Sequence, residues 1–283
     1  MQQASGPNAR RPAAPEQAPA SAADIDPRDP LLVRSVEKAF RVLHAFSPEH
    51  QNMSLSQVAA ATGLDMSAAQ RFTHTLVKLG YLRRDRETKR FELTTRTLDL
   101  GYSYIRASTL VELTVPYIMH LSKATEETVS LTVLDGTEIV YIARFVSRNM
   151  LNTDVIVGTR LPAYCTAPGI SILSRMASVN ARDVLDRSEL RSYTPQTTWR
   201  MPDLLKKIQT ARERGYATAS EEIYLDDLSF ASAIIGSKGY PESALTIATS
   251  KTRYDAKEAE EKFAPLVVVA ARSLSRAHPV QTQ

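Results

Sequence analysis

A single cysteine, Cys165, is present among the 283 residues, which excludes an intrachain disulfide and a zinc site built from several cysteines. Long apolar runs are also absent, since the run near the C-terminus covers only residues 266–271 and a membrane-spanning helix needs about 18 residues. No apolar stretch follows Arg10 and Arg11, so a secretory signal is not indicated. The 43% apolar content still suffices for a large domain or for two ordinary ones. We therefore expect a cytoplasmic protein without a membrane segment.

The sequence offers little that supports catalysis. The motifs G-x-S-x-G, H-E-x-x-H and G-x-G-x-x-G and the P-loop are missing, and the five histidines are scattered without metal-ligand spacing. Cys165 with a distant histidine is an alternative nucleophile pair, but a buried or pocket-lining thiol is the simpler interpretation. Glu221 and Glu222 are adjacent, so on a strand they would point to opposite faces. We predict a protein that is not an enzyme and has no catalytic residues, metal or cofactor.

Positive charge is concentrated in one block of the chain. Residues 1–30 hold three Lys and Arg against four Asp and Glu, residues 31–96 hold eleven against six, and residues 97–283 hold 21 of each. The net charge of +4 therefore arises from the second block. A local excess of positive charge, in a chain whose remainder is nearly neutral, indicates a nucleic-acid-binding module next to a domain with a different function.

Three helices and a hairpin are predicted within the basic block, after a disordered tail over residues 1–30 that contains six prolines and no aromatic residue. The first helix starts near residue 32, and its apolar face is expected to consist of Val33, Val36, Phe40 and Leu43, widened by Ala39, Val42 and Phe46. Ser54 and Gln57 form a capping box at the start of a short second helix. Asp65 is the expected cap of a third helix over residues 66–79.

The third helix carries two stripes of opposite character. The stripe expected to be buried consists of Ala69, Phe72, Leu76 and Leu79. The other contains no acid, and all its members can donate a hydrogen bond or carry positive charge: Ser67, Gln70, Arg71, His74 and Lys78. The hairpin that follows adds five cations: Arg83, Arg84, Arg86, Lys89 and Arg90.

This order of elements predicts a winged helix-turn-helix DNA-binding domain over residues 31–94. A helix fits the major groove, where base edges present distinct patterns of donors and acceptors. Arg71 suits a guanine and Gln70 an adenine, while Ser67 or His74 suits a phosphate or a base edge. The cations of the hairpin, the wing, would neutralise phosphates. The alternative interpretation is an ordinary solvated helix and hairpin.

The remaining chain predicts an α+β domain behind a helical linker. The linker helix is expected over residues 95–109, the second domain over residues 110–277 and a short tail over residues 278–283. Strands are expected at 127–134, 138–144, 151–157, 216–223, 229–236 and 243–250. Helices are expected at 110–125, 169–177, 180–186, 203–214 and 256–276. Strands mixed with helices outside strict β-α-β alternation are typical of α+β folds.

Several segments resemble one family of bacterial transcription regulators, the isocitrate-lyase-regulator (IclR) family. In the first domain these are VRSVEKAFRVLHAF, LSQVAAATGL, SAAQRFTHTLVKLGYL and RFELT. In the second they are DGTEIVYIAR, GTRLPAYCTAPG, ARERGYATASEE and SALTIATS. DGTEIVYIAR and GTRLPAYCTAPG are most similar to regulators of aromatic-acid catabolism, including those for protocatechuate and the β-ketoadipate pathway. The resemblance implies a GAF-like antiparallel-sheet effector domain that holds a small organic acid.

The resemblance also implies which residues line the effector pocket. The loop of residues 164–169 precedes a helix whose N-terminal N–H groups suit a carboxylate. Carried over onto this chain, the pocket positions are Tyr164, Cys165, Thr166, Ala167, Pro168, Gly169, Glu222, Ser229, Thr246 and Ala248. Ser229 and Thr246 are small polar residues in apolar strands, so we expect neighbouring strands to turn both hydroxyls toward one cavity. The alternative is that each hydroxyl bonds its own sheet or core.

Two departures from the family pattern concern the charge of the pocket. Ile170 stands where the family often has lysine, and residues 225–228 replace a loop that commonly contains glycine and arginine. A cation is therefore missing, and Arg144, Arg148 and Arg160 are candidates to replace it as the partner of a carboxylate.

We interpret the chain as a sequence-specific DNA-binding regulator controlled by a small organic, aromatic carboxylic acid and governing an aromatic-compound catabolic operon. Its expected partners are double-stranded operator DNA, the effector and further copies of itself, as a homodimer or a dimer of dimers. One alternative is a DNA-binding architectural protein without a ligand. The other is an enzyme acting on aromatic acids.

Overall fold

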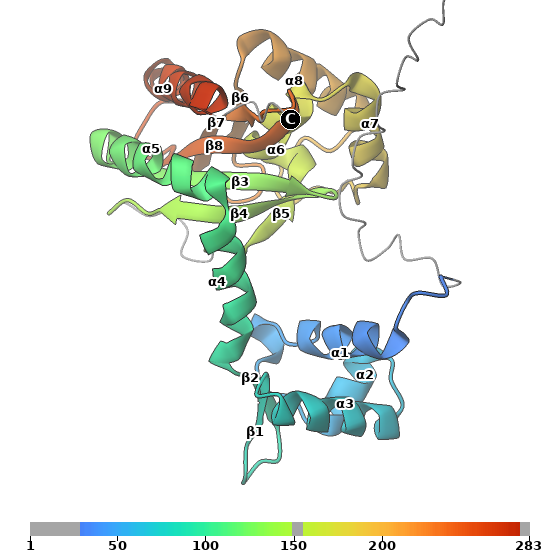
Figure 1. Cartoon of the computed structure of the whole chain (residues 1–283). Coiled ribbons are helices and arrows are strands. Elements are labelled where there is room, and N and C mark those ends of the chain that lie inside the picture. Colours follow the sequence, from blue (N-terminus) through green and yellow to red (C-terminus); the bar gives the residue numbers. More distant parts are fainter. Residues whose placement is uncertain (1–28, 149–154, 278–283) are drawn as a thin grey trace, which may run out of the picture.

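The computed structural model describes residues 29–148 and 155–277. The predicted tails over residues 1–30 and 278–283 lie almost entirely outside the described residues. Part of the strand predicted over residues 151–157 does so too, and residues 155–157 are not in a strand. The elements form an N-terminal helical domain with a hairpin, a connecting helix and a sheet covered by helices (Figure 1).

The N-terminal domain contains the predicted three helices and hairpin. Its elements are α1 (Arg34–His44), η2 (Pro48–His50), α2 (Leu55–Thr62), α3 (Met66–Lys78), β1 (Leu82–Arg84) and β2 (Phe91–Leu93). Local capping explains where α2 and α3 begin, because Ser54 and Gln57 form the capping box and Asp65 accepts from the N–H of Ala68 at 2.8 Å. Gly63 ends α2 at φ 66°, in the left-handed region that favours glycine.

The apolar face predicted for α1 is only partly correct. Val42 and Phe46 are buried in the core of the domain, whereas Val36 is 52% exposed and Phe40 48% exposed. Leu79, at the end of α3, is also exposed rather than buried. The helix has apolar residues on two sides, but only one of them packs against α2 and α3. The other side has no cover within the described part of this single chain.

A helical connection joins the two domains. The short turn η3 (Thr95–Thr97) leads into α4 (Leu98–Ala107), and α5 (Thr109–Thr125) follows directly. Ser108 separates the two helices with extended backbone, and its hydroxyl accepts from the N–H of Val111 at 3.3 Å. Pro116 lies inside α5.

The C-terminal domain is built on one antiparallel sheet with the strand order β5-β4-β3-β8-β7-β6. The strands are β3 (Thr128–Asp135), β4 (Glu138–Phe145), β5 (Arg160–Pro162), β6 (Ala217–Ser220), β7 (Asp227–Ile235) and β8 (Pro241–Ser250). The helical elements are η4 (Ala163–Cys165), α6 (Ala167–Arg175), α7 (Ser178–Arg187), α8 (Met201–Arg214) and α9 (Ala256–Ala277). The fold is therefore α+β, as predicted.

Two hydrophobic clusters lie on opposite faces of this sheet. One joins α5 and α9 to the sheet, with Ile118, Leu131, Ile247 and Phe263 at its centre. The other joins α6, α7 and α8 on the opposite side, as Figure 1 shows. The helices thus cover both faces, and α6 packs against β7 and β8 in the middle of the sheet.

Strand β6 is shorter than predicted, because the chain turns after Ser220. Glu221 at φ 55° and Asp226 at φ 65° both adopt left-handed backbone, which interrupts a strand. The N–H of Glu221 donates to the carbonyl of Asp227 at 2.8 Å and closes the turn. The segment between these residues therefore forms a loop at the edge of the sheet.

Candidate functional site

The polar stripe of α3 is fully available to a partner. Its five members are all exposed: Ser67, Gln70, Arg71, His74 and Lys78. Gln70 and His74 line a groove whose other wall holds Arg84 and Phe91 of the hairpin. The structure therefore brings part of the predicted recognition stripe together with one cation of the wing.

The wing cations fall into two groups. Arg83 pairs with Glu92, and Arg90 donates from Nη1 to the carbonyl of Asn52 at 3.0 Å and to Gln57 Oε1 at 3.1 Å. These contacts tie the hairpin to itself and to α2. The described contacts of the other three cations lie within the hairpin: the Arg84 guanidinium lies 5.4 Å from the centroid of the Phe91 ring and donates to the carbonyl of Lys89 at 3.2 Å, and Lys89 donates to the carbonyl of Arg86 near the turn.

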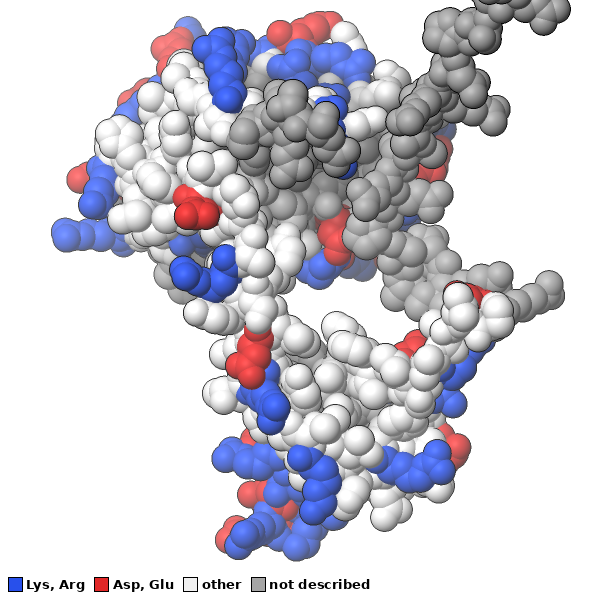
Figure 2. All heavy atoms as spheres, in the orientation of Figure 1, with Lys and Arg blue, Asp and Glu red and all other residues white. Residues whose placement is uncertain are grey.

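Positive charge gathers at the end of the N-terminal domain that holds the wing. Figure 2 shows Lys and Arg side chains around the tip of the hairpin below α3. Asp85 in the turn accepts from the N–H and the hydroxyl of Thr88, and these hydrogen bonds lower the pKa of Asp85. Asp85 therefore stabilises the backbone conformation of the turn at the tip of the wing.

Strand register creates a cavity on the α6 side of the sheet. Arg144 on β4 lies opposite Ser130 on β3, and Ser130 lies opposite Thr246 on β8. Thr128 and Ser229 belong to a second row, two residues further along the strands. Residues two apart on a strand share a face, so both rows line one cavity of about 60 Å³. Such a space suits a compact ligand.

Two buried polar atoms on the cavity wall lack a hydrogen-bond partner within the described residues: Arg144 Nε and Thr246 Oγ1. Arg144 Nη1 donates to Ser130 Oγ at 3.3 Å. Burial lowers the pKa of the Arg144 guanidinium, but from so high a value that the group stays charged. The wall thus presents a cation and a hydroxyl with unused hydrogen-bonding capacity.

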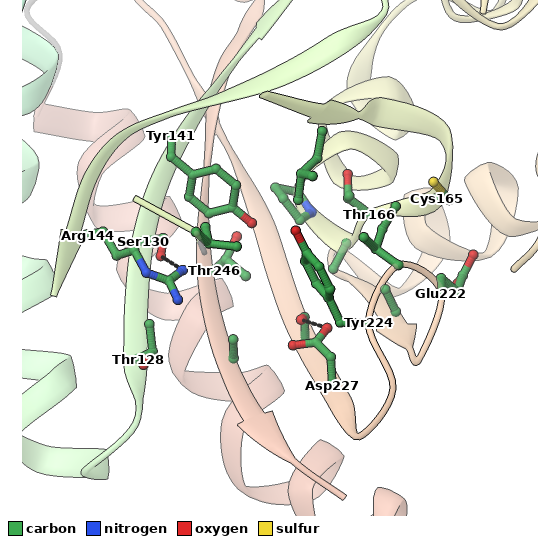
Figure 3. Close-up of a pocket in the computed structure, with 18 residues that line it drawn as sticks. Thr128, Ser130, Tyr141, Arg144, Cys165, Thr166, Glu222, Tyr224, Asp227 and Thr246 are labelled. Carbon is green, nitrogen blue, oxygen red and sulfur yellow. Dashed lines mark hydrogen bonds between the residues drawn. The ribbon is translucent and has the colours of Figure 1, made fainter. Parts of the chain in front are cut away.

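The opposite wall of the cavity carries a carboxylate. Asp227, at the start of β7, accepts from Ser229 Oγ at 2.7 Å. Burial raises the pKa of Asp227 to about 6, although the Ser229 hydrogen bond and the nearby Arg144 charge oppose this shift. Tyr141 and Tyr224 also line the cavity (Figure 3).

Two family models cover these sites, the IclR helix-turn-helix domain over residues 35–86 and the bacterial transcriptional regulator IclR C-terminal domain over residues 102–276. The chain belongs to the IclR family. It is therefore a DNA-binding transcription regulator rather than an enzyme.

Curated relatives within the IclR family include regulators of aromatic catabolism. The Pca regulon regulatory protein of Pseudomonas putida is 30% identical over 275 residues, which cover 95% of this chain and 94% of the relative. The p-hydroxybenzoate hydroxylase transcriptional activator of Acinetobacter baylyi is 28% identical, covering 90% of this chain and 95% of the relative.

Solved structures share the architecture. A transcriptional regulator from Rhodococcus sp. RHA1 is 33% identical, covers 87% of this chain and 98% of its own, and has a TM-score of 0.76. An IclR homologue from Microbacterium hydrocarbonoxydans, solved in complex with 4-hydroxybenzoate, covers 86% and 98% at 22% identity, with a TM-score of 0.70. At that identity the second likeness shows the fold alone.

Eight of the ten positions carried over from the IclR family line the cavity: Cys165, Thr166, Ala167, Pro168, Glu222, Ser229, Thr246 and Ala248. Tyr164 does not, because it is fully buried and its hydroxyl donates to the carbonyl of Arg191 at 2.8 Å. Gly169 does not either, since its backbone packs so closely on Ala163 that a Cβ would lie 2.1 Å from the Ala163 oxygen. These two residues shape the loop instead of facing the cavity.

Other groups near the cavity are already engaged. Glu222 forms an ion pair with Lys207 and accepts from the N–H of Thr198 at 3.1 Å. Thr166 caps α6 by accepting from the N–H of Gly169 at 3.3 Å, so one N–H of this helix end is not available to a ligand. Burial raises the pKa of Cys165 to about 12, so its thiol is not ionised at neutral pH.

Of the three arginines considered as replacements for the missing cation, Arg144 alone lines the cavity. Arg160 is bound by Asp135 at 2.5 Å and by Glu138 at 2.8 Å at the edge of the sheet. Arg148 is exposed and lies outside the cavity lining. Ile170 also points away, into the cluster around α8.

Sequence reasoning named Arg144 only as one of three candidates, and it missed nine residues of the cavity: Thr128, Ser130, Tyr141, Val155, Leu161, Ala219, Ile223, Tyr224 and Asp227. The alternation of polar and apolar residues along the predicted strand contained the signal for Thr128 and Ser130. No cluster of metal-ligand type occurs in the two described segments. No helix of these segments is long and apolar enough to cross a membrane.

Proposed function

We propose that this regulator is controlled by a small aromatic carboxylic acid bound in the cavity, and that it governs genes for the breakdown of aromatic compounds. One observation carries the proposal: Arg144 Nε and Thr246 Oγ1 are buried on the cavity wall without partners. Such atoms are costly to bury, and a carboxylate supplies acceptors for both. The names of the P. putida and A. baylyi relatives and the 4-hydroxybenzoate complex of the M. hydrocarbonoxydans homologue support an aromatic acid.

At the other end of the molecule, we propose that α3 reads the major groove. Its exposed stripe has no acidic member, and a guanidinium such as that of Arg71 matches the two acceptors of a guanine edge. Arg84, Arg86 and Lys89 would then contact phosphates beside the groove. Arg83 and Arg90 would hold the hairpin in place through Glu92 and α2, and we assign them a supporting role.

The exposed apolar residues of α1 and α4 support a homodimer. Val36 and Phe40 on α1 and Tyr102 and Tyr104 on α4 are all exposed in the single chain, and large apolar side chains exposed on two neighbouring elements favour contact with another protein surface. A second copy is the partner that suits them, because two identical DNA-binding domains match a two-fold symmetric operator.

The order of elements provides a route from the cavity to the DNA. Ser130 and Arg144 lie on β3 and β4, which pack against α5, and α5 follows α4 after the single residue Ser108. A ligand that draws β3 and β4 toward β7 would bias the position of α5, and with it the placement of the DNA-binding domains.

The test combines calorimetry with DNA binding. Wild type, Arg144→Gln and the control Arg148→Gln are titrated with 4-hydroxybenzoate, 3,4-dihydroxybenzoate and benzoate, and binding to a DNA site selected from random sequence is measured with and without acid. We expect Arg144→Gln to weaken acid binding about tenfold or more and to leave ligand-free DNA binding unchanged. Arg148→Gln, outside the cavity, should behave as wild type.

The alternative hypothesis, a DNA-binding protein without a ligand, predicts the opposite result. If no acid of the panel binds or raises the melting temperature of the wild type, the architectural DNA-binding alternative gains support and the effector proposal fails. Equal acid binding by wild type and Arg144→Gln would also contradict the proposed site.

A further inference from the structure

The cavity contains two carboxylates in different situations. Glu222 is neutralised by Lys207. Asp227 is not, because no ion pair links it to a cation within the described residues, and its described hydrogen-bond donor is the neutral hydroxyl of Ser229. An anion-binding pocket therefore holds an unneutralised acid of its own.

Arg144 and Asp227 lie on opposite sides of the cavity and do not bond each other (Figure 3). Arg144 comes from β4 and Asp227 from β7, with β3 and β8 between them in the sheet. The rings of Tyr141 and Tyr224 lie along the space between the two charges. The pocket thus has a positive end and a negative end, with aromatic side chains beside the space between them.

This inference rests on the proposed function: we propose that Asp227 makes the pocket selective for aromatic acids that carry a hydroxyl group away from the carboxylate. The ligand carboxylate binds Arg144 and Thr246. The ligand hydroxyl donates to the free oxygen of Asp227, whose other oxygen is held by Ser229. Ser229 is then a positioning residue that orients Asp227 and does not itself need to contact the ligand.

Acids without the hydroxyl are disfavoured for two separate reasons. A plain benzoate removes water from Asp227 and offers no donor in exchange, and a site built to bond a hydroxyl rejects the analogue that lacks it. A dicarboxylate brings a second negative charge against Asp227 in a poorly solvated space, where like charges repel strongly. The same residue therefore separates hydroxybenzoates from both classes.

The ionisation of Asp227 fits this role. Burial raises its pKa to about 6, which leaves the group mostly ionised at neutral pH as an acceptor for a hydroxyl. A half-buried carboxylate with a single donor still has hydrogen-bonding capacity to offer, so the ligand hydroxyl would complete its coordination.

The test compares three acids of similar shape by titration calorimetry at about pH 7.5: 4-hydroxybenzoate, benzoate and terephthalate, which has a second carboxylate in place of the hydroxyl. We expect the wild type to prefer 4-hydroxybenzoate over benzoate by about tenfold and to bind terephthalate least. Asp227→Asn should reduce the first preference and should strengthen terephthalate binding by about tenfold, because an amide N–H can donate to the added carboxylate.

Asp183→Asn is the matched control, since it removes an exposed carboxylate on α7 outside the cavity and should change none of the three affinities. Equal binding of the three acids by the wild type would overturn the inference, as would an equal change of all three affinities in Asp227→Asn. If this variant does not fold, the ranking by the wild type still decides. Failure of every acid to bind would instead contradict the proposed function itself.

Discussion

Single polar residues on the cavity wall differ in whether they have a hydrogen-bond partner within the described residues. Thr246 is only 4% exposed and its hydroxyl has no partner within the described residues, whereas the similarly buried Ser229 bonds Asp227. Burying a hydroxyl without a partner costs free energy, and burying it with one costs little. The two hydroxyls therefore have different roles, although both lie on the cavity side of neighbouring strands as the sequence predicted.

Replacing these two residues should separate the roles. Thr246→Val should weaken effector binding about tenfold while leaving the melting temperature of the ligand-free protein unchanged or slightly higher, because the hydroxyl has no hydrogen bond to give up. Ser229→Ala should weaken the binding of hydroxylated acids more than that of benzoate, since it acts through Asp227. Calorimetry and thermal melting measure both. Unchanged affinity in both variants would place the acid elsewhere.

Asp227 should also make stability depend on pH. Its pKa of about 6 in the folded protein exceeds that of an unfolded aspartate, about 3.9. Between these two pH values the folded state holds a proton that the unfolded state has released. The free energy of unfolding therefore falls as the pH rises from about 3.9 to about 6, and it stays at the lower value above that range. We expect ligand-free Asp227→Asn to melt several degrees above wild type at about pH 7.5 and to melt with it near pH 4.

The groups around Asp227 do not obscure this effect. Burial raises the pKa of Tyr141, and Arg144 stays charged, so neither titrates in the window. In Asp226, desolvation is outweighed by hydrogen bonds from Ser250 and Thr252, and its pKa is lowered. A constant difference between the two melting temperatures from pH 4 to about pH 7.5 would show that Asp227 does not titrate with a raised pKa.

Arg71 tests base recognition by α3. Arg71→Ala should lower binding to a specific site by about 1–3 kcal/mol more than binding to random DNA, because one side chain that reads a base edge contributes about that much. Arg182→Ala on α7, which removes an exposed guanidinium far from α3 in the sequence, is the control. Equal losses of affinity for both kinds of DNA, measured at one salt concentration, would show that Arg71 contacts only phosphate.

At the scale of elements, the sequence was informative wherever local chemistry decides the structure. Capping by Ser54 and Asp65 and the left-handed Gly63 set the limits of α2 and α3, and all of these signals are local. The prediction of the buried side of α1 was wrong for Val36 and Phe40, because periodicity shows that apolar residues share a face but not which face meets a neighbour. An oligomer surface and a core look alike in sequence.

The cavity shows the same limit. Family resemblance placed eight of its residues, yet Asp227 and Tyr141 depend on strand register and on the turn after Ser220, which arise from pairing between distant strands. Arg144 was one candidate among three, and only the pairing of β4 with β5 showed that Arg160 is occupied at the edge. The pairing of strands that are distant in the sequence cannot be predicted from the local spacing of residues.

The wing is the element whose contribution to DNA binding can be isolated. Alanine at Arg84, Arg86 and Lys89 together should weaken binding to every sequence, because these residues would contact phosphates and not bases. The dependence of log affinity on log salt should flatten by about one unit for each phosphate that the variant no longer neutralises. Fluorescence anisotropy over a salt series measures the slope, and an unchanged slope would mean that the hairpin does not lie on DNA.

At the scale of the whole molecule, the exposed apolar residues of α1 and α4 should determine assembly. Phe40→Glu with Tyr104→Glu should lower the dimer fraction in light scattering and weaken binding to a two-fold site, because charges replace apolar side chains at the interface. Val179→Glu on α7, which changes a residue that is 74% exposed, should do neither. A dimer that survives the double substitution would place the interface on another surface.

The alternation along β3 and β8 has a consequence for how such regulators diversify. Thr128, Ser130 and Thr246 face the cavity, while their immediate neighbours Val129 and Ile247 are buried against α5 and α9 on the other side of the sheet. A mutation at a cavity position should therefore change the surface offered to a ligand without opening a hole in the packed layer beneath. If the cavity binds an effector as proposed, a few substitutions on this face could change the effector, while the thermodynamic stability would depend on other positions of the same strands.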